Sequence, residues 1–254
     1  MKILAILQAR TSSTRLPGKV LKPLLGKPML ARQIERLRRA RLVDELLVAT
    51  SVDPSDDVLV ALCETEGLDC YRGSLDDVLD RFYRAAKSRS AANVVRLTGD
   101  CPLTDPLVVD RTIEFYLEGQ FDYASNALEP TFPDGLDVEV FRFSCLEAAW
   151  REAASPAFRE HVTLFIYRHA ERFRIGCYRN STNLAHLRWT VDEPQDYEFV
   201  KRVYEALYPE NPRFTMEDVL RFLGQHPDAL ALNRGMERNE GLARSLLRDS
   251  HPKG

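Results

Sequence analysis

The sequence has few of the features that mark secreted, membrane or nucleic-acid-coating proteins. It contains five cysteines in 254 residues, and no two of them form a CxxC pair, which argues against a disulfide framework or a zinc site. No apolar run approaches the length of a membrane span. The apolar start, MKILAILQ, is followed too soon by Arg10 and Arg15 to be a signal peptide. We therefore expect a cytoplasmic protein without membrane insertion.

A broad excess of positive charge is also missing. Charged residues make up 29% of the chain, hydrophobic residues 44%, and the formal net charge is −3. This is an ordinary composition for a globular protein. A protein that coats nucleic acid needs a wide basic surface, so we expect no nucleic-acid partner, and any positive patch must be local.

Apolar runs typical of strands alternate along the chain with helical patterns. Residues 3–7 and 46–50 read as buried parallel strands, and 29–41 between them has helical spacing. Helices are also expected at 55–66 and 76–89, and helix starts at Asp105-Pro106, Ser155-Pro156 and Thr215 with Asp218. Further strands are expected at 93–100, 121–125, 136–143, 174–178 and 187–191.

This alternation predicts an α/β protein with a single doubly wound, mostly parallel sheet. We expect one main domain over 1–232, with a smaller extended and helical lobe inserted at roughly 120–185, for dimerisation or sugar binding. Residues 233–254 are polar, lack a sustained apolar period, and are expected to form a loosely attached tail.

In a doubly wound sheet the ligand lies at the carboxyl ends of the strands, so the loops after strands are the informative ones. The first such loop, 8–19, carries Arg10, Arg15 and Lys19, with Gly18 beside the lysine. Arginine and lysine side chains together with backbone N–H groups suit phosphate. The loop is neither a Walker A loop nor a GxGxxG turn. A solvated basic loop is the plain alternative.

Two later loops each place an acid at a strand end. Asp100 follows the strand ending in RLTG, and Asp192 follows LRWTV. If both face one crevice, they can share a Mg²⁺ ion that also takes phosphate oxygens. Taken singly, Asp100 fits an Asx turn and Asp192 fits a helix start equally well.

The stretch QARTSSTRLPGKVL resembles the N-terminal signature of the cytidylyltransferases that activate acidic sugars, among them the 3-deoxy-manno-octulosonate and acylneuraminate enzymes. Over nearly the whole chain, the sequence is more similar to the spore-coat polysaccharide biosynthesis branch of that superfamily. The blocks that carry the resemblance, in order, are YRGSLDDVLDRFY, RLTGDCPLTDP, PDGLDVEVF, REHVT, HLRWTVDEPQDYEFV and NEGLARSLLRD.

The resemblance implies a GT-A-like nucleotidyltransferase fold, Mg²⁺ (or Mn²⁺) as cofactor, and a homodimer. The reaction that it implies is transfer of CMP from CTP to an acidic sugar with release of pyrophosphate, in the biosynthesis of surface polysaccharides or glycoconjugates. It implies catalytic roles for Arg15, Lys19 and Asp100 and metal binding by Asp100 and Asp192. The nucleotide-binding residues implied are Leu7, Gln8, Ala9, Arg10, Ser13, Arg15, Lys19, Arg72, Gly73, Ser74, Asp77, Thr98 and Gly99.

Acceptor contacts are less well defined by the sequence. Asp137 and Glu139 share one face of a strand, which suits a sugar, a second metal or simply a solvent-facing edge. The resemblance also implies sugar contact for Arg159, Glu160 and His161, which read on their own as a helix-surface cluster. The alternatives left open are another nucleoside triphosphate, a non-sugar acceptor, and a nucleotide-sugar glycosyltransferase of similar fold.

Overall fold

The computed structural model describes residues 2–233, 235, 238 and 240–250. The strands are β1 (Ile3–Gln8), β2 (Pro23–Leu24), β3 (Lys27–Pro28), β4 (Glu45–Ser51), β5 (Cys70–Gly73), β6 (Asn93–Thr98), β7 (Tyr123–Ser125), β8 (Glu139–Arg142) and β9 (Ile175–Cys177). The helices are α1 (Met29–Leu37), α2 (Asp57–Thr65), α3 (Val78–Ser88), α4 (Pro106–Glu118), α5 (Phe143–Glu152), α6 (Pro156–Glu160), α7 (Leu164–Arg168), α8 (Pro194–Leu207), α9 (Met216–Gln225), α10 (Pro227–Leu230) and α11 (Glu240–Ser250). Two short 3₁₀ helices are η1 (Lys19–Leu21) and η2 (Pro54–Asp56).

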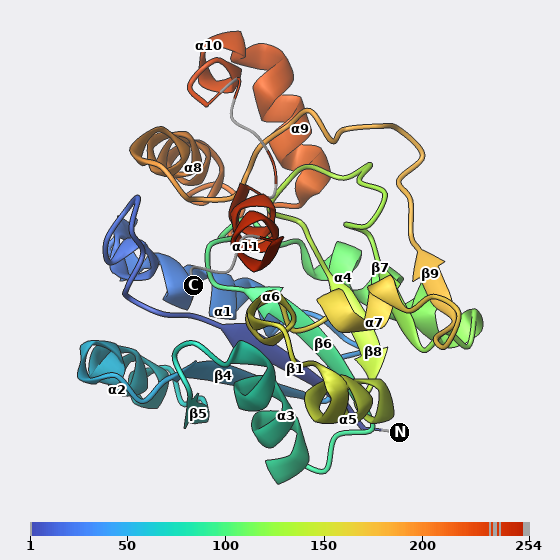
Figure 1. Cartoon of the computed structure of the whole chain (residues 1–254). Helices are drawn as coiled ribbons and strands as arrows, with labels where there is room; N and C mark the ends of the chain where they lie inside the picture. The colour runs from blue at the N-terminus through green and yellow to red at the C-terminus, as the bar shows by residue number, and fades with distance from the viewer. Residues whose placement is uncertain (1, 234, 236–237, 239, 251–254) are drawn as a thin grey trace.

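Within the described residues, a seven-stranded sheet in the order β5-β4-β1-β6-β8-β7-β9 forms the centre of the molecule (Figure 1). The first four strands are parallel to one another. Strand β8 then runs antiparallel to both β6 and β7, and β9 is parallel to β7. The predicted doubly wound, mostly parallel α/β sheet is confirmed.

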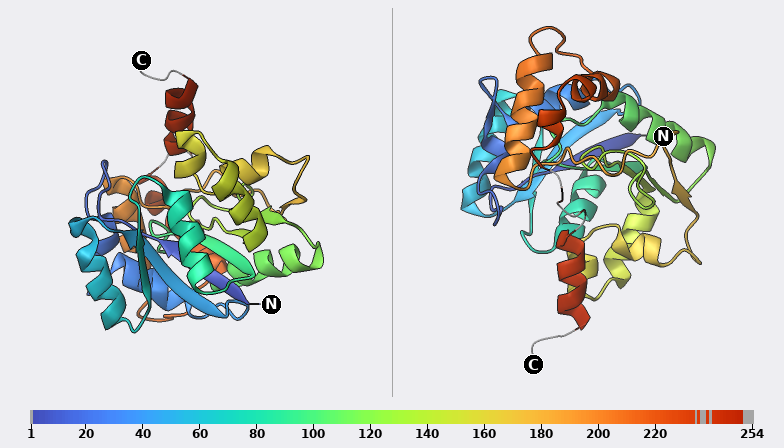
Figure 2. Two further views of the ribbon diagram at one scale, coloured as in Figure 1. Left: turned by 60° about the horizontal axis from the view of Figure 1, so that its bottom comes forward. Right: turned by 90° about the horizontal axis from the view of Figure 1, so that it is seen from above.

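Helices cover both faces of the sheet (Figures 1 and 2). Side chains alternate along a strand, so Ile3, Ala5 and Leu7 of β1 face one core and Leu4 and Ile6 face the other. The first core also contains apolar residues of α1, α2, α4, α8 and α9, and the second contains those of α3, α5 and α7. Burying both faces leaves the loops at the strand ends as the place for a ligand.

The predicted helix starts are confirmed by their capping hydrogen bonds. Asp105 accepts from the backbone N–H of Leu107 at 2.8 Å, and Ser155 accepts from that of Phe158 at 3.3 Å. Thr215 and Asp218 form a capping box at the start of α9. These side chains satisfy N–H groups that have no partner within the helix.

The predicted strand at 187–191 is wrong. This segment pairs through its backbone with loop residues instead of a strand: Trp189 N donates to Asp134 O at 2.6 Å, and Val191 N donates to Asp100 O at 2.8 Å. The strand predicted at 136–143 is shortened to β8, because the side-chain amide of Asn126 bonds both Leu136 O and Val138 N.

The segment expected to be a loose tail contains helix α11, which projects from the body of the molecule in Figure 2. The Ser245 hydroxyl donates to Glu160 Oε2 at 2.8 Å, and Asp249 Oδ2 accepts from the backbone N–H of Ala157 at 3.0 Å. Both contacts join α11 to α6. Among the residues described, no helix combines the length and the apolar character that a membrane crossing requires.

Candidate active site

Hydrogen bonds anchor the basic loop after β1, residues 8–19, near both of its ends. The backbone N–H and the hydroxyl of Thr11 both donate to the buried carboxylate of Asp56 at 2.8 Å. Gly18 N donates to Thr11 O at 3.0 Å, and Gly18 itself has φ 65°, a conformation that costs glycine little. This turn leads directly into η1 and directs Lys19 toward the interior.

The ammonium of Lys19 lies between Asp100, which follows β6, and Asp192, which follows the extended segment 187–191. Its Nζ donates to Asp100 Oδ2 at 3.1 Å, Asp192 Oδ1 at 2.8 Å and Val191 O at 2.8 Å. Only 9% of Lys19 is exposed. Burial by itself would lower the pKa of Lys19, but Asp100 and Asp192 together raise it. The predicted convergence of Asp100 and Asp192 is present in the structure.

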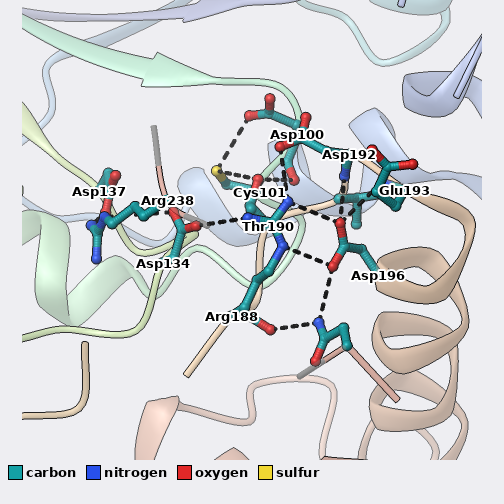
Figure 3. A network of polar contacts seen from close by, with 12 residues as sticks. Asp100, Cys101, Asp134, Asp137, Arg188, Thr190, Asp192, Glu193, Asp196 and Arg238 are labelled. Carbon is teal, nitrogen blue, oxygen red and sulfur yellow. Dashed lines mark hydrogen bonds and ion pairs between the residues drawn. The ribbon is translucent and has the colours of Figure 1, made fainter. Parts of the chain in front are cut away.

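Backbone hydrogen bonds hold these two acids side by side. Asp100 O accepts from Val191 N at 2.8 Å and from the Thr190 hydroxyl at 3.3 Å. On the other side, the buried Asp196 in the first turn of α8 accepts from the backbone N–H groups of Asp192 and Glu193 at 3.0 Å (Figure 3). The position of Asp192 therefore depends on the start of α8.

Two arginines complete the charge cluster around Asp192. Arg15 pairs with Asp192 at 3.0 Å and with Glu193 at 3.3 Å. Arg188 contacts Asp192 at 3.1 Å, Asp134 at 3.1 Å and Asp196 at 2.9 Å (Figure 3). Burial would lower the pKa of Arg188, but Asp196 and the other acids raise it, so this guanidinium stays charged.

A cleft of about 760 Å³, called the large cleft below, opens over this cluster. Its walls come from the loop after β1, the start of α3, the end of β6 and the helix α6. The predicted nucleotide residues that line it are Gln8, Ala9, Arg10, Ser13, Arg15, Lys19, Asp77, Thr98 and Gly99. Gly99 is needed where two loops touch, because a Cβ there would lie 3.0 Å from Ala9 Cβ and from Gln8 O.

Four predicted nucleotide residues do not line this cleft. Leu7 is buried in β1. Arg72 turns away, donating to Ser51 O at 2.9 Å and Asp53 O at 3.0 Å. Gly73 belongs to β5, and its O accepts from Val52 N at 2.9 Å. Ser74 also lies off the cleft, and its hydroxyl accepts from Asp77 N at 3.0 Å just before α3. The residues after Ser74, 75–78, reach the cleft instead.

A second cavity of about 320 Å³, called the small cavity below, adjoins the large cleft. The residues that line both are Arg15, Arg96, Thr98, Asp100, His161 and Asp192. The predicted sugar residues Asp137, Glu139 and His161 line the small cavity, whereas Arg159 and Glu160 line the large cleft. Asp100 and Asp192 therefore lie where the two spaces meet.

The acids of the small cavity each have a positively charged partner. Glu139 forms an ion pair with Arg96 and accepts from the Tyr123 hydroxyl at 2.7 Å and the Thr163 hydroxyl at 2.5 Å. Burial opposes ionisation of Glu139, but Arg96 and these hydroxyls hold its pKa below the usual value. Glu139 is therefore a carboxylate that can accept further hydrogen bonds.

Asp137 differs from Glu139, although it also has a positively charged partner. It pairs with Arg238 from the C-terminal segment. Burial raises the pKa of Asp137 to about 7, against the effect of Arg238. This carboxyl therefore titrates near neutrality, while Glu139 does not.

Four arginines of the site were not among the predicted residues: Arg81, Arg96, Arg188 and Arg238. Arg81 lines the large cleft with 2% of its surface exposed. For Arg96 a signal was available, because it interrupts the buried apolar strand NVVRLT. An arginine in a buried strand needs a charged partner or a ligand. Arg238 lies in the segment predicted to be a tail and has no such signal.

The residues present fit a divalent cation that is shared with a bound phosphate. Asp100 and Asp192 already converge on one cation, the Lys19 ammonium. Within the part of the chain that the structure describes, no group of three or more His, Cys, Asp or Glu side chains is placed to hold a metal ion. Two carboxylates plus substrate phosphates is the usual way in which Mg²⁺ is bound.

Comparisons with known proteins agree on the family that they indicate for this chain. The model of the cytidylyltransferase family matches residues 4–218. The spore coat polysaccharide biosynthesis protein SpsF of Bacillus subtilis is 34% identical over 236 residues, covering 89% of this chain and 96% of SpsF. The 3-deoxy-manno-octulosonate cytidylyltransferase of Trichlorobacter lovleyi is 38% identical over 119 residues, 46% of each chain. A solved cytidylyltransferase structure from Leptospira borgpetersenii is 30% identical, with a TM-score of 0.88, and covers 94% of this chain and 100% of that one. The chain therefore belongs to the cytidylyltransferase family, as its sequence motifs predict, and is a nucleotidyltransferase.

Proposed function

We infer that the protein transfers CMP from CTP to a hydroxyl of a sugar and releases pyrophosphate. The observation that carries this proposal is the meeting of the large cleft and the small cavity at Asp100 and Asp192. A triphosphate in the large cleft and an acceptor in the small cavity would meet at that point. Family membership supports CTP as the donor, and the names of two relatives, SpsF and the 3-deoxy-manno-octulosonate enzyme, support a sugar as the acceptor.

The residues of the large cleft are suited to in-line transfer. Attack of the acceptor oxygen on the α-phosphorus places charge on the non-bridging oxygens and on the departing pyrophosphate. Arg10, Arg15 and Lys19 line the cleft, and their positive charges would stabilise the negative charge that develops. When bound, Mg²⁺ or Mn²⁺ held by Asp100 and Asp192 would neutralise phosphate charge and orient the phosphate oxygens.

In the small cavity, the acceptor would meet a wall of carboxylates. Asp134, Asp137 and Glu139 line it, and their oxygens accept hydrogen bonds from hydroxyl groups. Arg96 lines both spaces and is held by Glu139. This arrangement suits an acceptor with several hydroxyls whose reacting hydroxyl faces Asp100 and Asp192.

We further propose that the base is read by the segment 75–78, where the chain reaches the large cleft. Backbone N–H and C=O groups of this segment would pair with the ring acceptors and the amino group of cytosine, and a mismatched base would leave buried polar groups unpaired. Thermal-shift titration with each of the four nucleoside triphosphates plus Mg²⁺ measures this preference. Equal stabilisation by UTP or ATP would count against cytidine specificity.

The homodimer implied by the resemblance and the cytoplasmic location expected from the composition remain part of this proposal. Light scattering at micromolar concentration is expected to show a species of twice the chain mass. A solution containing only a 29.0 kDa species would contradict the dimer.

The decisive experiment measures pyrophosphate release from each nucleoside triphosphate in the presence of Mg²⁺ and a panel of sugars. The panel includes 3-deoxy-manno-octulosonate, an acylneuraminate and neutral hexoses. We expect release with CTP and at least one sugar, and formation of the corresponding CMP-sugar detected by mass spectrometry. Release of a nucleoside diphosphate from a nucleotide sugar instead would identify a glycosyltransferase and overturn the proposal.

A further inference from the structure

Lys19 has no hydrogen-bond donor to spare for a phosphate in this structure. A lysine ammonium carries three N–H donors and no acceptor. Three oxygens lie within hydrogen-bond distance of Lys19 Nζ: Asp100 Oδ2 at 3.1 Å, Asp192 Oδ1 at 2.8 Å and Val191 O at 2.8 Å. To contact a triphosphate, Lys19 must therefore give up at least one of these bonds.

The same two carboxylates are the residues that fit a metal ion. The protonated Nζ of Lys19 has no lone pair with which to coordinate a metal ion, and it carries a full positive charge. A divalent cation placed between Asp100 and Asp192 would lie where this ammonium is now, and two cations in one small space repel each other. Lys19 and a metal ion therefore compete for these acids.

The surroundings explain why an ammonium is needed when no metal is bound. Asp100 and Asp192 are held together by backbone contacts that do not involve Lys19, such as Val191 N to Asp100 O at 2.8 Å. Two fixed, neighbouring carboxylates need a cation between them. The side chain of Lys19 is 11% exposed, and this partial burial strengthens the attraction between its ammonium and the two acids.

We propose that Lys19 is a stand-in for the metal ion: its ammonium occupies the place between Asp100 and Asp192 in the free enzyme and leaves when metal and nucleotide bind. The negative charge of the triphosphate draws Lys19 off the acids, and the acids then receive the metal. Binding of metal and of nucleotide are thereby coupled through one side chain. This inference rests on the proposed function only for the identity of the triphosphate.

The test measures Mn²⁺ binding to the full chain by electron paramagnetic resonance, with and without CTP. For the wild type, CTP is expected to raise the Mn²⁺ affinity strongly. Lys19→Met removes the ammonium and keeps the apolar stem, and it is expected to raise the nucleotide-free Mn²⁺ affinity by about tenfold or more. Lys22→Met is the matched control. It removes the lysine that directly follows η1, whose ammonium lies over the Tyr197 ring at 4.9 Å, and is expected to change the affinity by less than about threefold.

A second measurement uses the wild type alone, in case Lys19→Met does not fold. Saturating Mn²⁺ without nucleotide should expel the Lys19 ammonium and speed its acetylation by acetic anhydride, followed by peptide mass spectrometry. Acetylation of Lys22 should not change. Equal Mn²⁺ affinity of the wild type and Lys19→Met, or a Lys19 acetylation rate that Mn²⁺ leaves unchanged, would overturn the proposal.

These measurements also separate the stand-in role from the proposed function. If the protein shows the expected Mn²⁺ binding but releases no pyrophosphate from CTP with any of the sugars, the exchange of Lys19 for the metal is supported and the proposed sugar transfer is rejected. If the protein transfers CMP to a sugar but Lys19→Met leaves the Mn²⁺ affinity unchanged, the proposed function is supported and the exchange of Lys19 for the metal is rejected.

Discussion

The large cleft and the small cavity meet at Asp100 and Asp192 but differ in the charge that they present. Among the described residues, each space is lined by five acidic side chains, but six basic side chains line the large cleft and only three line the small cavity. The difference follows the sheet. Loops at the carboxyl ends of parallel strands supply most of the large cleft, and side chains on and around the antiparallel β7 and β8 supply much of the small cavity.

This contrast teaches that one sheet offers two kinds of site. Loops after parallel strands can gather backbone N–H groups and long basic side chains around an anion. The antiparallel strand β8 and the segment that leads into it instead present acidic side chains to the small cavity, as Glu139 and Asp137 show. The predictions below test whether the two spaces act as separately as their charges suggest, starting with the residues shared by both.

The largest effect is expected from the shared acids. Asp100→Asn and Asp192→Asn each remove a charged group at the junction, and loss of several kcal/mol of charge stabilisation corresponds to about 10³-fold in rate. Because the two acids serve one cation, the double variant should lose little more than the worse single variant. Rates of pyrophosphate release and circular dichroism of each variant provide the measurement.

Asp228→Asn is the matched control for these two substitutions, because Asp228 is an exposed acid paired with Arg202. It is expected to leave the rate unchanged. If the losses of rate multiply in the Asp100 and Asp192 double variant, the two acids act independently. The proposal that they hold one shared cation would then be rejected.

A smaller effect, confined to the large cleft, is expected for Lys19→Ala. Loss of a charge-assisted contact that strengthens in the transition state should cost about 2–4 kcal/mol, or roughly 30- to 1000-fold in kcat/KM. The KM for the acceptor should change little, because Lys19 does not line the small cavity. Steady-state kinetics with saturating metal checks both values, with Lys22→Ala as control. A kcat/KM within about threefold of the wild type would exclude Lys19 from the triphosphate site.

A still smaller effect, confined to the small cavity, is expected for Glu139→Gln. The amide can still accept from Tyr123 and Thr163 but no longer neutralises Arg96. We expect the acceptor KM to rise about tenfold and the Kd for CTP to stay within about twofold. Glu152→Gln, in an exposed pair with Arg172, is the control. An equal loss of CTP and acceptor binding would mean that the two spaces are not separate.

The smallest effect concerns the pH dependence of stability. Burial raises the pKa of Asp137 to about 7, with Asp134 and Glu139 adding to the shift and Arg238 opposing it. The folded state therefore holds a proton that the unfolded chain releases at about pH 4. The protonated carboxyl favours the folded state at low pH, and this contribution is lost as pH rises through about 7.

Asp137→Asn removes this pH-dependent loss of stability, because an amide does not titrate. Relative to the wild type, the variant is expected to gain in free energy of unfolding between about pH 5 and about pH 8. Urea unfolding at the two pH values measures the difference, and Asp228→Asn again serves as control. A difference that is the same at both pH values would show that Asp137 does not titrate in this range.

Several features of this protein were determined by the sequence alone, because they depend on residues close together in the chain. The spacing of apolar residues predicts the strands and helices around the first βαβ unit, and Asp105, Ser155 and Thr215 mark helix starts that the structure confirms. The positions of Asp100 and Asp192 directly after apolar runs indicate the metal-binding candidates, and the ordered motifs identify the family.

Only the tertiary structure decided which charges meet. Lys19 and Asp192 are 173 positions apart in the sequence. The residues next to each of them in the chain do not indicate that the Lys19 ammonium pairs with Asp192 instead of pointing freely into the cleft. For the same reason the sequence does not identify the partners of Arg96 and Arg238. The segment 187–191 has the apolar pattern of a strand, but its backbone partners are loop residues far away in the sequence. Local spacing reports periodicity and caps, whereas ion pairs depend on the order of the strands and on burial, which only the folded chain establishes.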